Sequence, residues 1–149
     1  MLKLIESVDL WHLFKDDPVR PHLTANFRTS PGRESFLLED NDQIRAVICC
    51  AYTNQVPITE QQLDLYSQAA CQEDGQGTIA VFYTVWSYDR GAGRDIVLAA
   101  RDFVRDTRGC KRFVTLSPLT EMAERFHLRN GATLLDRGDE CQNFEYPPT

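Results

Sequence analysis

The sequence has no run of about 18 apolar residues, the length that a membrane-spanning helix requires. Its longest charge-free stretches, residues 46–59 and 75–88, are diluted by Thr, Asn, Gln, Ser and Gly. The N-terminal segment MLKLIESVDLWHLFKDD carries acidic residues where a secretion signal needs a basic region followed by an apolar run. We therefore expect a cytoplasmic protein that does not bind or span a membrane.

The five cysteines lack any pattern of metal ligation or redox chemistry. Their number is odd, and none belongs to a CxxC motif or to a Cys/His pair with metal-ligand spacing. We expect reduced thiols and no metal. Cys49 and Cys50 follow Ala-Val-Ile, which is typical of small apolar residues in a buried strand.

Net positive charge is also absent. The net charge of −6 argues against nucleic acid as a partner, because phosphate backbones bind basic surfaces. The charge is uneven, however, since residues 90–112 contain seven basic and three acidic side chains and so carry +4, which leaves −10 for the rest. Any site for an anion is expected in that segment.

The length and the element pattern indicate one α/β domain over residues 1–149. A chain of 149 residues matches a single domain, which typically contains ~100–200 residues. We expect strands at 34–38, 44–52, 78–86, 112–116, 132–135 and 142–146, helices at 8–15, 58–71, 95–108 and 120–129, a polar loop at 72–77 and a break at 117–118.

The segment 78–86, TIAVFYTVW, is the clearest element. It is rich in β-branched and aromatic residues and nearly free of polar ones, which is typical of a strand buried on both faces. A glycine turn, a helix that ends at Gly109 and a second strand follow it, so at least one right-handed crossover is expected. The predicted fold is a mixed sheet flanked by helices.

The glycine turn is the first candidate site. It brings backbone N–H groups and a helix N-terminus together, an arrangement that can hold a phosphate or a pyrophosphate. Arg90 and Arg94 flank the turn and can add charged hydrogen bonds. The turn is neither GxxxxGK[ST] nor GxGxxG, so nucleoside triphosphate and dinucleotide sites have no support. The arginines of the following helix are interpreted as a solvated face, paired at i,i+4 with Asp102 and Asp106.

Three further side chains can carry chemistry, although each has an ordinary structural interpretation. His127 lies among apolar residues of a short helix, where a histidine is usually structural, but its pKa suits proton transfer in a cleft. Ser117 follows a buried strand, where it can cap a turn or reach a ligand at the carboxyl end of the sheet. Without other information, Tyr146 is a core or surface aromatic residue.

These motifs resemble the GNAT acyltransferase superfamily, and within it the catalytic domain of malonyl-CoA decarboxylase. AVFYTVWSYDRGAG is similar to that family's AVFYSIS and the Gln/Gly-rich turn that follows it, and FVTLSPL to its LSPIPGF. ERFHLRNGATL is similar to NFHLxNGAxL, and NFEY to NYxY. The resemblance covers most of the chain after about residue 34. The family's N-terminal helical domain and the helical insertion after LSPIPGF have no counterpart here, so we expect a minimal form.

The resemblance implies a set of site residues. The family's catalytic histidine, its LSP serine and its NYxY tyrosine fall on His127, Ser117 and Tyr146, and its glutamate falls on Asp95 if one residue is gapped. The coenzyme A pyrophosphate is then expected on the turn. The residues expected to bind the coenzyme are Arg90, Gly91, Ala92, Gly93 and Arg94, together with Thr84.

The implied activity is decarboxylation of malonyl-CoA, or of a related β-carboxyl acyl-CoA, through a thioester enolate and without a metal. In this interpretation the coenzyme A thioester is the substrate and the partner of the protein. Two alternatives stay open: a GNAT N-acetyltransferase that uses acetyl-CoA, and an inactive acyl-CoA-binding module. A homo-oligomer is compatible with each of them.

Overall fold

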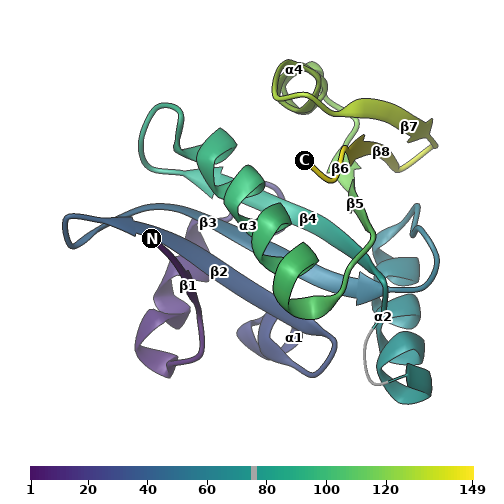
Figure 1. Ribbon diagram of the computed structural model, residues 1–149, viewed down its shortest axis with the longest axis horizontal. Helices are drawn as coiled ribbons and strands as arrows, with labels where there is room; N and C mark the ends of the chain where they lie inside the picture. Colours follow the sequence, from purple (N-terminus) through teal and green to yellow (C-terminus); the bar gives the residue numbers. More distant parts are fainter. Residues whose placement is uncertain (75–76) are drawn as a thin grey trace.

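A computed structural model describes residues 1–74 and 77–149. It contains a single mixed sheet with helices on both faces (Figure 1). The strands are β1 Leu2–Leu4, β2 Arg33–Asp40, β3 Gln43–Thr53, β4 Ile79–Ser87, β5 Arg112–Thr115, β6 Ser117–Pro118, β7 Thr133–Arg137 and β8 Cys141–Tyr146. The helices are the 3-10 helix η1 Val8–Asp16 and the α-helices α1 Ala25–Thr29, α2 Glu60–Asp74, α3 Ala92–Arg108 and α4 Glu121–Arg129.

The strand order places β4 near the middle of the sheet. The order is β1-β2-β3-β4-β5-β8-β6, and β7 pairs with β8 outside this path. Neighbouring strands are antiparallel except for β4 and β5, which are parallel and are joined through α3. The expected α/β architecture and its crossover are therefore confirmed.

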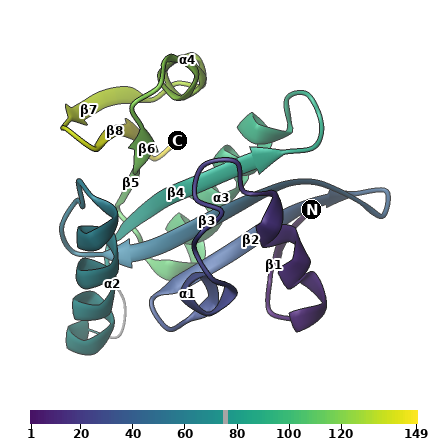
Figure 2. The ribbon, with the colours of Figure 1, turned by 180° about the vertical axis from the view of Figure 1, so that it is seen from behind.

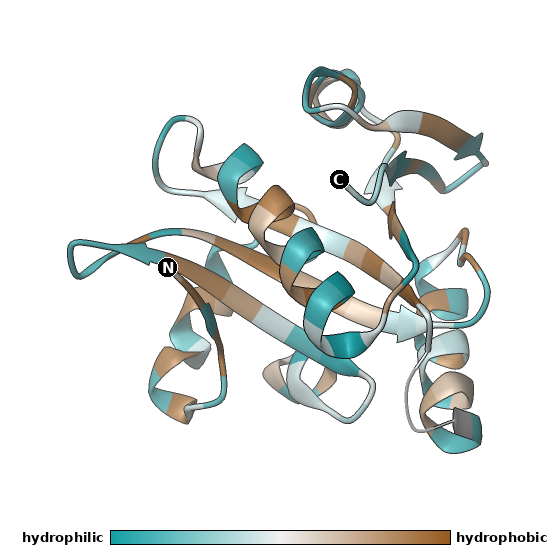
Figure 3. Cartoon of the chain, viewed as in Figure 1, coloured by the Kyte–Doolittle hydropathy of each residue, from teal (hydrophilic) through white to brown (hydrophobic). Residues whose placement is uncertain are grey.

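Two apolar cores lie on opposite faces of the sheet. Ala80 and Phe82 of β4 belong to the core under α3, whereas Val81 and Tyr83 belong to the core that η1 and other residues of the first third of the chain cover. Figure 2 shows α1, α2 and η1 on the face opposite α3, and Figure 3 shows hydrophobic residues concentrated along the strands. This confirms the prediction that residues 78–86 form a strand buried on both faces.

Several local features differ from the expectations. The short elements β1 and α1 were not predicted, because three and five residues are too few to show a periodic pattern. Residues 117–118, expected as a break, pair with β8 as strand β6. Helix α3 begins three residues earlier than predicted, at Ala92, and α2 continues to Asp74. Residues 75 and 76 of the predicted loop lie outside the described residues.

Arg94 of α3 is exposed, but Arg101, Arg105 and Arg108 do not form the solvated face that their spacing indicated. Arg101 is only 8% exposed, and its Nη1 donates to the carbonyl of Pro147 over 3.2 Å. Arg105 donates to the carbonyl of Pro148, and Arg108 binds both carboxylate oxygens of Glu34. These arginines therefore hold the C-terminal residues and strand β2 against the helix.

Within the described ranges, no helix is long and apolar enough to cross a membrane. The same residues contain no group of three His, Cys, Asp or Glu side chains placed to hold a metal ion. All five cysteines are free, and Cys49 and Cys50 are fully buried in β3 as predicted.

Candidate functional site

The two parallel strands separate and leave a cavity between them. β4 and β5 pair from Ile79 and Arg112 as far as Phe82 and Thr115, and the amide of Leu116 still donates to the Phe82 carbonyl over 3.2 Å. Beyond this point β4 continues to Ser87, while the segment that follows β5 turns away into β6. A cavity of about 270 Å³ occupies the gap, lined by the second half of β4, the region of β6, α3 and α4.

An irregularity in β4 shapes one wall of this cavity. Cys49 pairs with Thr84 and Cys50 with Phe82, so Tyr83 has no partner in β3 and the strand bulges there. The Tyr83 carbonyl instead accepts a hydrogen bond from Arg20. Thr84 lines the cavity, and its buried hydroxyl has no hydrogen-bond partner within the described part of the chain. The wall of the cavity therefore contains an unsatisfied hydroxyl.

His127 and Tyr146 form a buried hydrogen-bonded pair. His127 Nδ1 lies 2.7 Å from the Tyr146 hydroxyl, and the imidazole stacks on Phe144 with ring centroids 5.3 Å apart. Helix α4 positions the histidine, because the Thr120 hydroxyl caps its N-terminus and Asn130 its C-terminus. His127 also lines the cavity, which leaves its Nε2 edge for a ligand.

Burial sets the protonation states of this pair. It lowers the pKa of His127 to about 4, so the imidazole is neutral at pH 7. Burial raises the pKa of Tyr146, while Asn130, Arg101 and Arg94 oppose the rise. The hydroxyl is therefore protonated at pH 7, and the two arginines stabilise its anionic form if a proton is withdrawn.

Ser117 lies on the same cavity as His127. Its hydroxyl is 2.8 Å from that of Thr115, which also accepts the amide proton of Phe144 over 3.0 Å. Ser117 is only 3% exposed, so a ligand in the cavity meets a fixed hydroxyl rather than a mobile one. The structure thus brings Ser117, Thr84 and His127 to one cavity, with Tyr146 behind the histidine.

The structure does not bring Asp95 to this group. Its side chain is 52% exposed and pairs with Arg45 Nη1 at 3.4 Å, away from the lining of the cavity. Asp95 lies in the first turn of α3, so the helix directs its carboxylate toward β3 and solvent. Asp95 is therefore not placed to contact a ligand in the cavity.

The glycine turn lies at the N-terminus of α3, beside the cavity. Gly91 is the capping residue, with a φ of +83° that favours glycine, and no side chain caps the helix. A Cβ atom at Gly91 would meet nothing within 4 Å, so this part of the turn is open. The space beside Gly93 is filled, because a Cβ atom there would lie 3.1 Å from the Phe126 ring. Ala92 is buried and faces the core.

The two arginines of the turn are free to bind an anion. Arg90 and Arg94 are exposed, and neither forms an ion pair with any residue that the structure describes. The amide of Ala92 donates to the Asp89 carbonyl over 3.2 Å, and the remaining N–H groups of the first helical turn add partial positive charge at the same place. The turn therefore has the chemistry expected of a diphosphate site.

Sequence reasoning missed the contribution of the first third of the chain. Pro18 and Val19 line the cavity, and Arg20 binds the bulge of β4. Residues 17–21 show no periodicity, and the prolines at both ends indicate only a loop. No sequence signal connects this loop with β4.

The depressed pKa of His127 predicts a pH-dependent stability. The unfolded chain takes up a proton near pH 6.5, whereas the folded protein takes it up only near pH 4. Protonation therefore favours unfolding, and stability falls as the pH drops through this window, by about 3 kcal/mol in total. Denaturant titrations from pH 7 to pH 4 measure the loss. In His127→Gln the loss should be smaller by this amount, and equal slopes for both proteins would contradict the assignment.

Solved structures with this architecture include both enzyme classes considered above. Malonyl-CoA decarboxylase from Agrobacterium vitis is 23% identical over 85% of this chain, with a TM-score of 0.57, and the match covers 35% of that protein. The N-acetyltransferase PseH of Campylobacter jejuni is 13% identical, with 97% of this chain and 95% of that one covered and a TM-score of 0.62. A spermidine N-acetyltransferase SpeG mutant from Vibrio cholerae is 11% identical, with 97% of this chain and 91% of that one covered and a TM-score of 0.63.

The fold is thus that of the GNAT structures, matched over most of the chain. The chain spans about a third of the length of the malonyl-CoA decarboxylase structures. No protein-family model and no curated protein matches the sequence.

Proposed function

We propose that this chain is an acyl-CoA decarboxylase similar to malonyl-CoA decarboxylase. The observation that carries the proposal is the pairing of His127 with Tyr146 at a cavity whose wall also contains Ser117. A proton carrier, its hydrogen-bonded partner and a fixed hydroxyl donor are the groups that such a reaction needs.

The coenzyme is proposed to bind at the start of α3. Its diphosphate lies against Gly91 and the first-turn N–H groups, and Arg90 and Arg94 add charge-assisted hydrogen bonds. Gly93 and Ser87 line the end of the cavity near this turn, which supports entry of the thioester arm between β4 and α4. The free hydroxyl of Thr84 supplies a hydrogen bond along this path.

The proposed reaction breaks one carbon–carbon bond and forms one carbon–hydrogen bond. The bond to the β-carboxylate breaks, CO2 leaves, and the electron pair moves into the thioester carbonyl to give an enolate. Donors directed at the enolate oxygen each contribute ~3–4 kcal/mol. His127 Nε2–H then protonates the carbon, while the Tyr146 proton moves to Nδ1 and is replaced from solvent.

The lining of the cavity favours loss of the carboxylate. No residue that lines the cavity in the described part of the chain carries a charge at pH 7, and Phe82, Trp86 and Phe126 supply much of the surface. A carboxylate held there is poorly solvated, whereas the enolate spreads its charge onto an oxygen that meets hydrogen-bond donors. The environment therefore favours the transition state over the bound substrate. Ser117 orients the carboxylate before it leaves.

The test is the product formed from three thioesters. We expect the purified protein to convert malonyl-CoA into acetyl-CoA, and methylmalonyl-CoA into propionyl-CoA, with acetyl-CoA left unchanged. Mass spectrometry of the acyl-CoA pool follows each conversion. Malonyl-CoA that stays intact through a long incubation would overturn the proposal.

An N-acetyltransferase is the second candidate. The match to PseH extends over nearly the whole length of both chains, which favours this activity, whereas the decarboxylase structures are much longer. The same assay separates the two, because an acetyltransferase releases free coenzyme A from acetyl-CoA when amines are added. Tight coenzyme binding without turnover of any thioester indicates the third possibility, a binding module.

A further inference from the structure

A loop from the opposite face of the sheet forms part of the wall of the cavity. Pro18 and Val19 follow η1, which lies on the face opposite α3 (Figure 2). Val19 lines a second cavity of about 270 Å³ as well, which Arg20, Glu60 and Glu140 also line. Val19 and Pro118 are common to both linings, so these two residues form the partition between the cavities.

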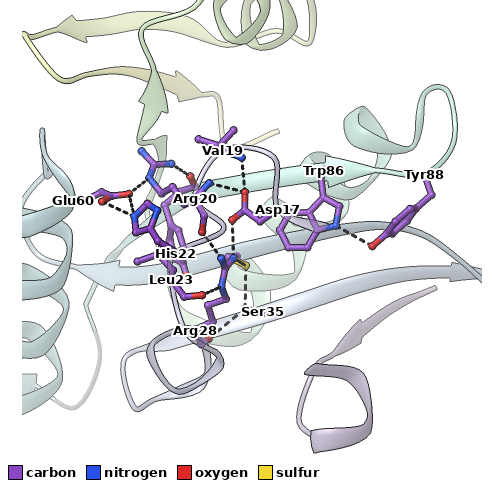
Figure 4. Close-up of polar contacts among 12 residues, drawn as sticks. Asp17, Val19, Arg20, His22, Leu23, Arg28, Ser35, Glu60, Trp86 and Tyr88 are labelled. Carbon is purple, nitrogen blue, oxygen red and sulfur yellow. Dashed lines mark hydrogen bonds and ion pairs between the residues drawn. The ribbon is translucent and has the colours of Figure 1, made fainter. Parts of the chain in front are cut away.

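A buried ion pair fixes the conformation of this loop. One oxygen of Asp17 accepts the amide protons of Val19 and Arg20 over 2.8 and 2.9 Å (Figure 4). The other oxygen lies 2.8 Å from Arg28 Nη1, and both side chains of this pair are 0% exposed. Arg28 Nη2 donates to the Arg20 carbonyl over 2.6 Å, which closes a ring of contacts around Val19.

Arg20 attaches the loop to the point where the strands part. Its guanidinium donates to the Tyr83 carbonyl at the bulge of β4, and its Nε lies 2.7 Å from Glu60. Tyr83 follows Phe82, whose carbonyl accepts the last hydrogen bond between the two strands, from the amide of Leu116. Val19 therefore lies at the end of the cavity where β4 and β5 part, whereas Ser87 and Gly93 lie at the end near the glycine turn.

We infer that Val19 sets the length of the acyl group that the cavity accepts. The inference rests on the proposed function, since it takes an acyl-CoA to enter from the glycine turn. The acyl group then points toward Val19, and its chain meets the valine methyl groups before it can reach the second cavity. Because the loop is anchored at Asp17 and at Arg20, it cannot simply move aside. The preferred substrates are therefore short acyl-CoAs.

Paired substitutions at Val19 test this inference. The side chain is 38% exposed, so the protein tolerates both a smaller and a larger residue. Affinities are measured by calorimetry for free coenzyme A and for its acetyl, propionyl, butyryl and hexanoyl thioesters. Val19→Ala should bind hexanoyl-CoA at least about tenfold more tightly than the wild type does. The affinity of Val19→Phe for propionyl-CoA should be lower than that of the wild type by a similar factor. Free coenzyme A should bind all three proteins equally.

The controls are the same changes at Val8, which is 67% exposed in η1 and does not line either cavity. Val8→Ala and Val8→Phe should keep the wild-type profile of affinity against acyl length. An unchanged profile in both Val19 variants would overturn the inference, even in a protein that decarboxylates malonyl-CoA. A profile that shifts in a protein without turnover would support the inference and contradict the decarboxylase. Failure of the wild type to bind any of the five ligands would overturn both.

Discussion

Replacement of His127 by alanine is expected to lower the rate of malonyl-CoA decarboxylation by about 10²–10⁴-fold, the usual contribution of a positioned proton donor. The substitution removes the Nε2–H that protonates the enolate carbon and leaves the Tyr146 hydroxyl without its 2.7 Å partner. Tyr146→Phe keeps the aromatic packing but removes the proton that moves to Nδ1, so it should also lower the rate, because a neutral imidazole that donates without this proton would become an anion. Steady-state kinetics with malonyl-CoA measure both losses.

Two comparisons separate this role from a loss of structure. His127→Ala should bind free coenzyme A with wild-type affinity, because the diphosphate is proposed to lie on the glycine turn and not against α4. His12→Ala removes an exposed imidazole from η1 and should keep the wild-type rate. If His127→Ala forms product as fast as the wild type, the histidine is not the proton donor.

The second large effect is expected from Arg28→Met, which should lower the free energy of unfolding by about 3–5 kcal/mol. The change leaves the Asp17 carboxylate buried without its counter-ion, and it removes the donors that hold the carbonyls of Arg20 and Leu23. The guanidinium also lies 5.2 Å from the ring centroid of Phe14, a contact that adds to the loss. Urea denaturation at pH 7 measures the change.

An exposed ion pair provides the matched control. Arg125 lies 3.7 Å from Glu121 on the surface of α4, with 76% of its side chain exposed. Arg125→Met should change the unfolding free energy by less than about 1 kcal/mol, because solvent screens such a pair. In the double variant Asp17→Leu, Arg28→Met, part of the lost stability should return, since no unpaired charge stays buried, although the amides of Val19 and Arg20 lose their acceptor. A cost below about 1 kcal/mol for Arg28→Met alone would contradict this account.

The second half of the fold could be predicted from the sequence because its signals are local. The apolar run of β4 and the glycines that end α3 and α4 each mark an element without reference to the rest of the chain. The approach of His127 to Tyr146 could not be derived in this way. That expectation came from the resemblance of two motifs to one family, and the structure places the two side chains in contact.

The remaining features depend on contacts between distant segments. In the sequence, Asp17 and Arg28 look like ordinary surface charges, and only the packed structure shows both at 0% exposure. The arginines of α3 looked solvated because the sequence does not show that Pro147 and Pro148 pass beside that helix. Asp95, which was matched to the family's glutamate through a gap, does not reach the cavity, because the first turn of α3 directs its side chain toward Arg45.

The position of Tyr146 depends on helix α3. Arg101 and Arg105 of that helix donate to the carbonyls of Pro147 and Pro148, the two residues that follow Tyr146. These bonds restrain β8 just beyond the phenol that pairs with His127. A truncation that removes the two prolines would therefore loosen the phenol and, with it, the imidazole that it orients.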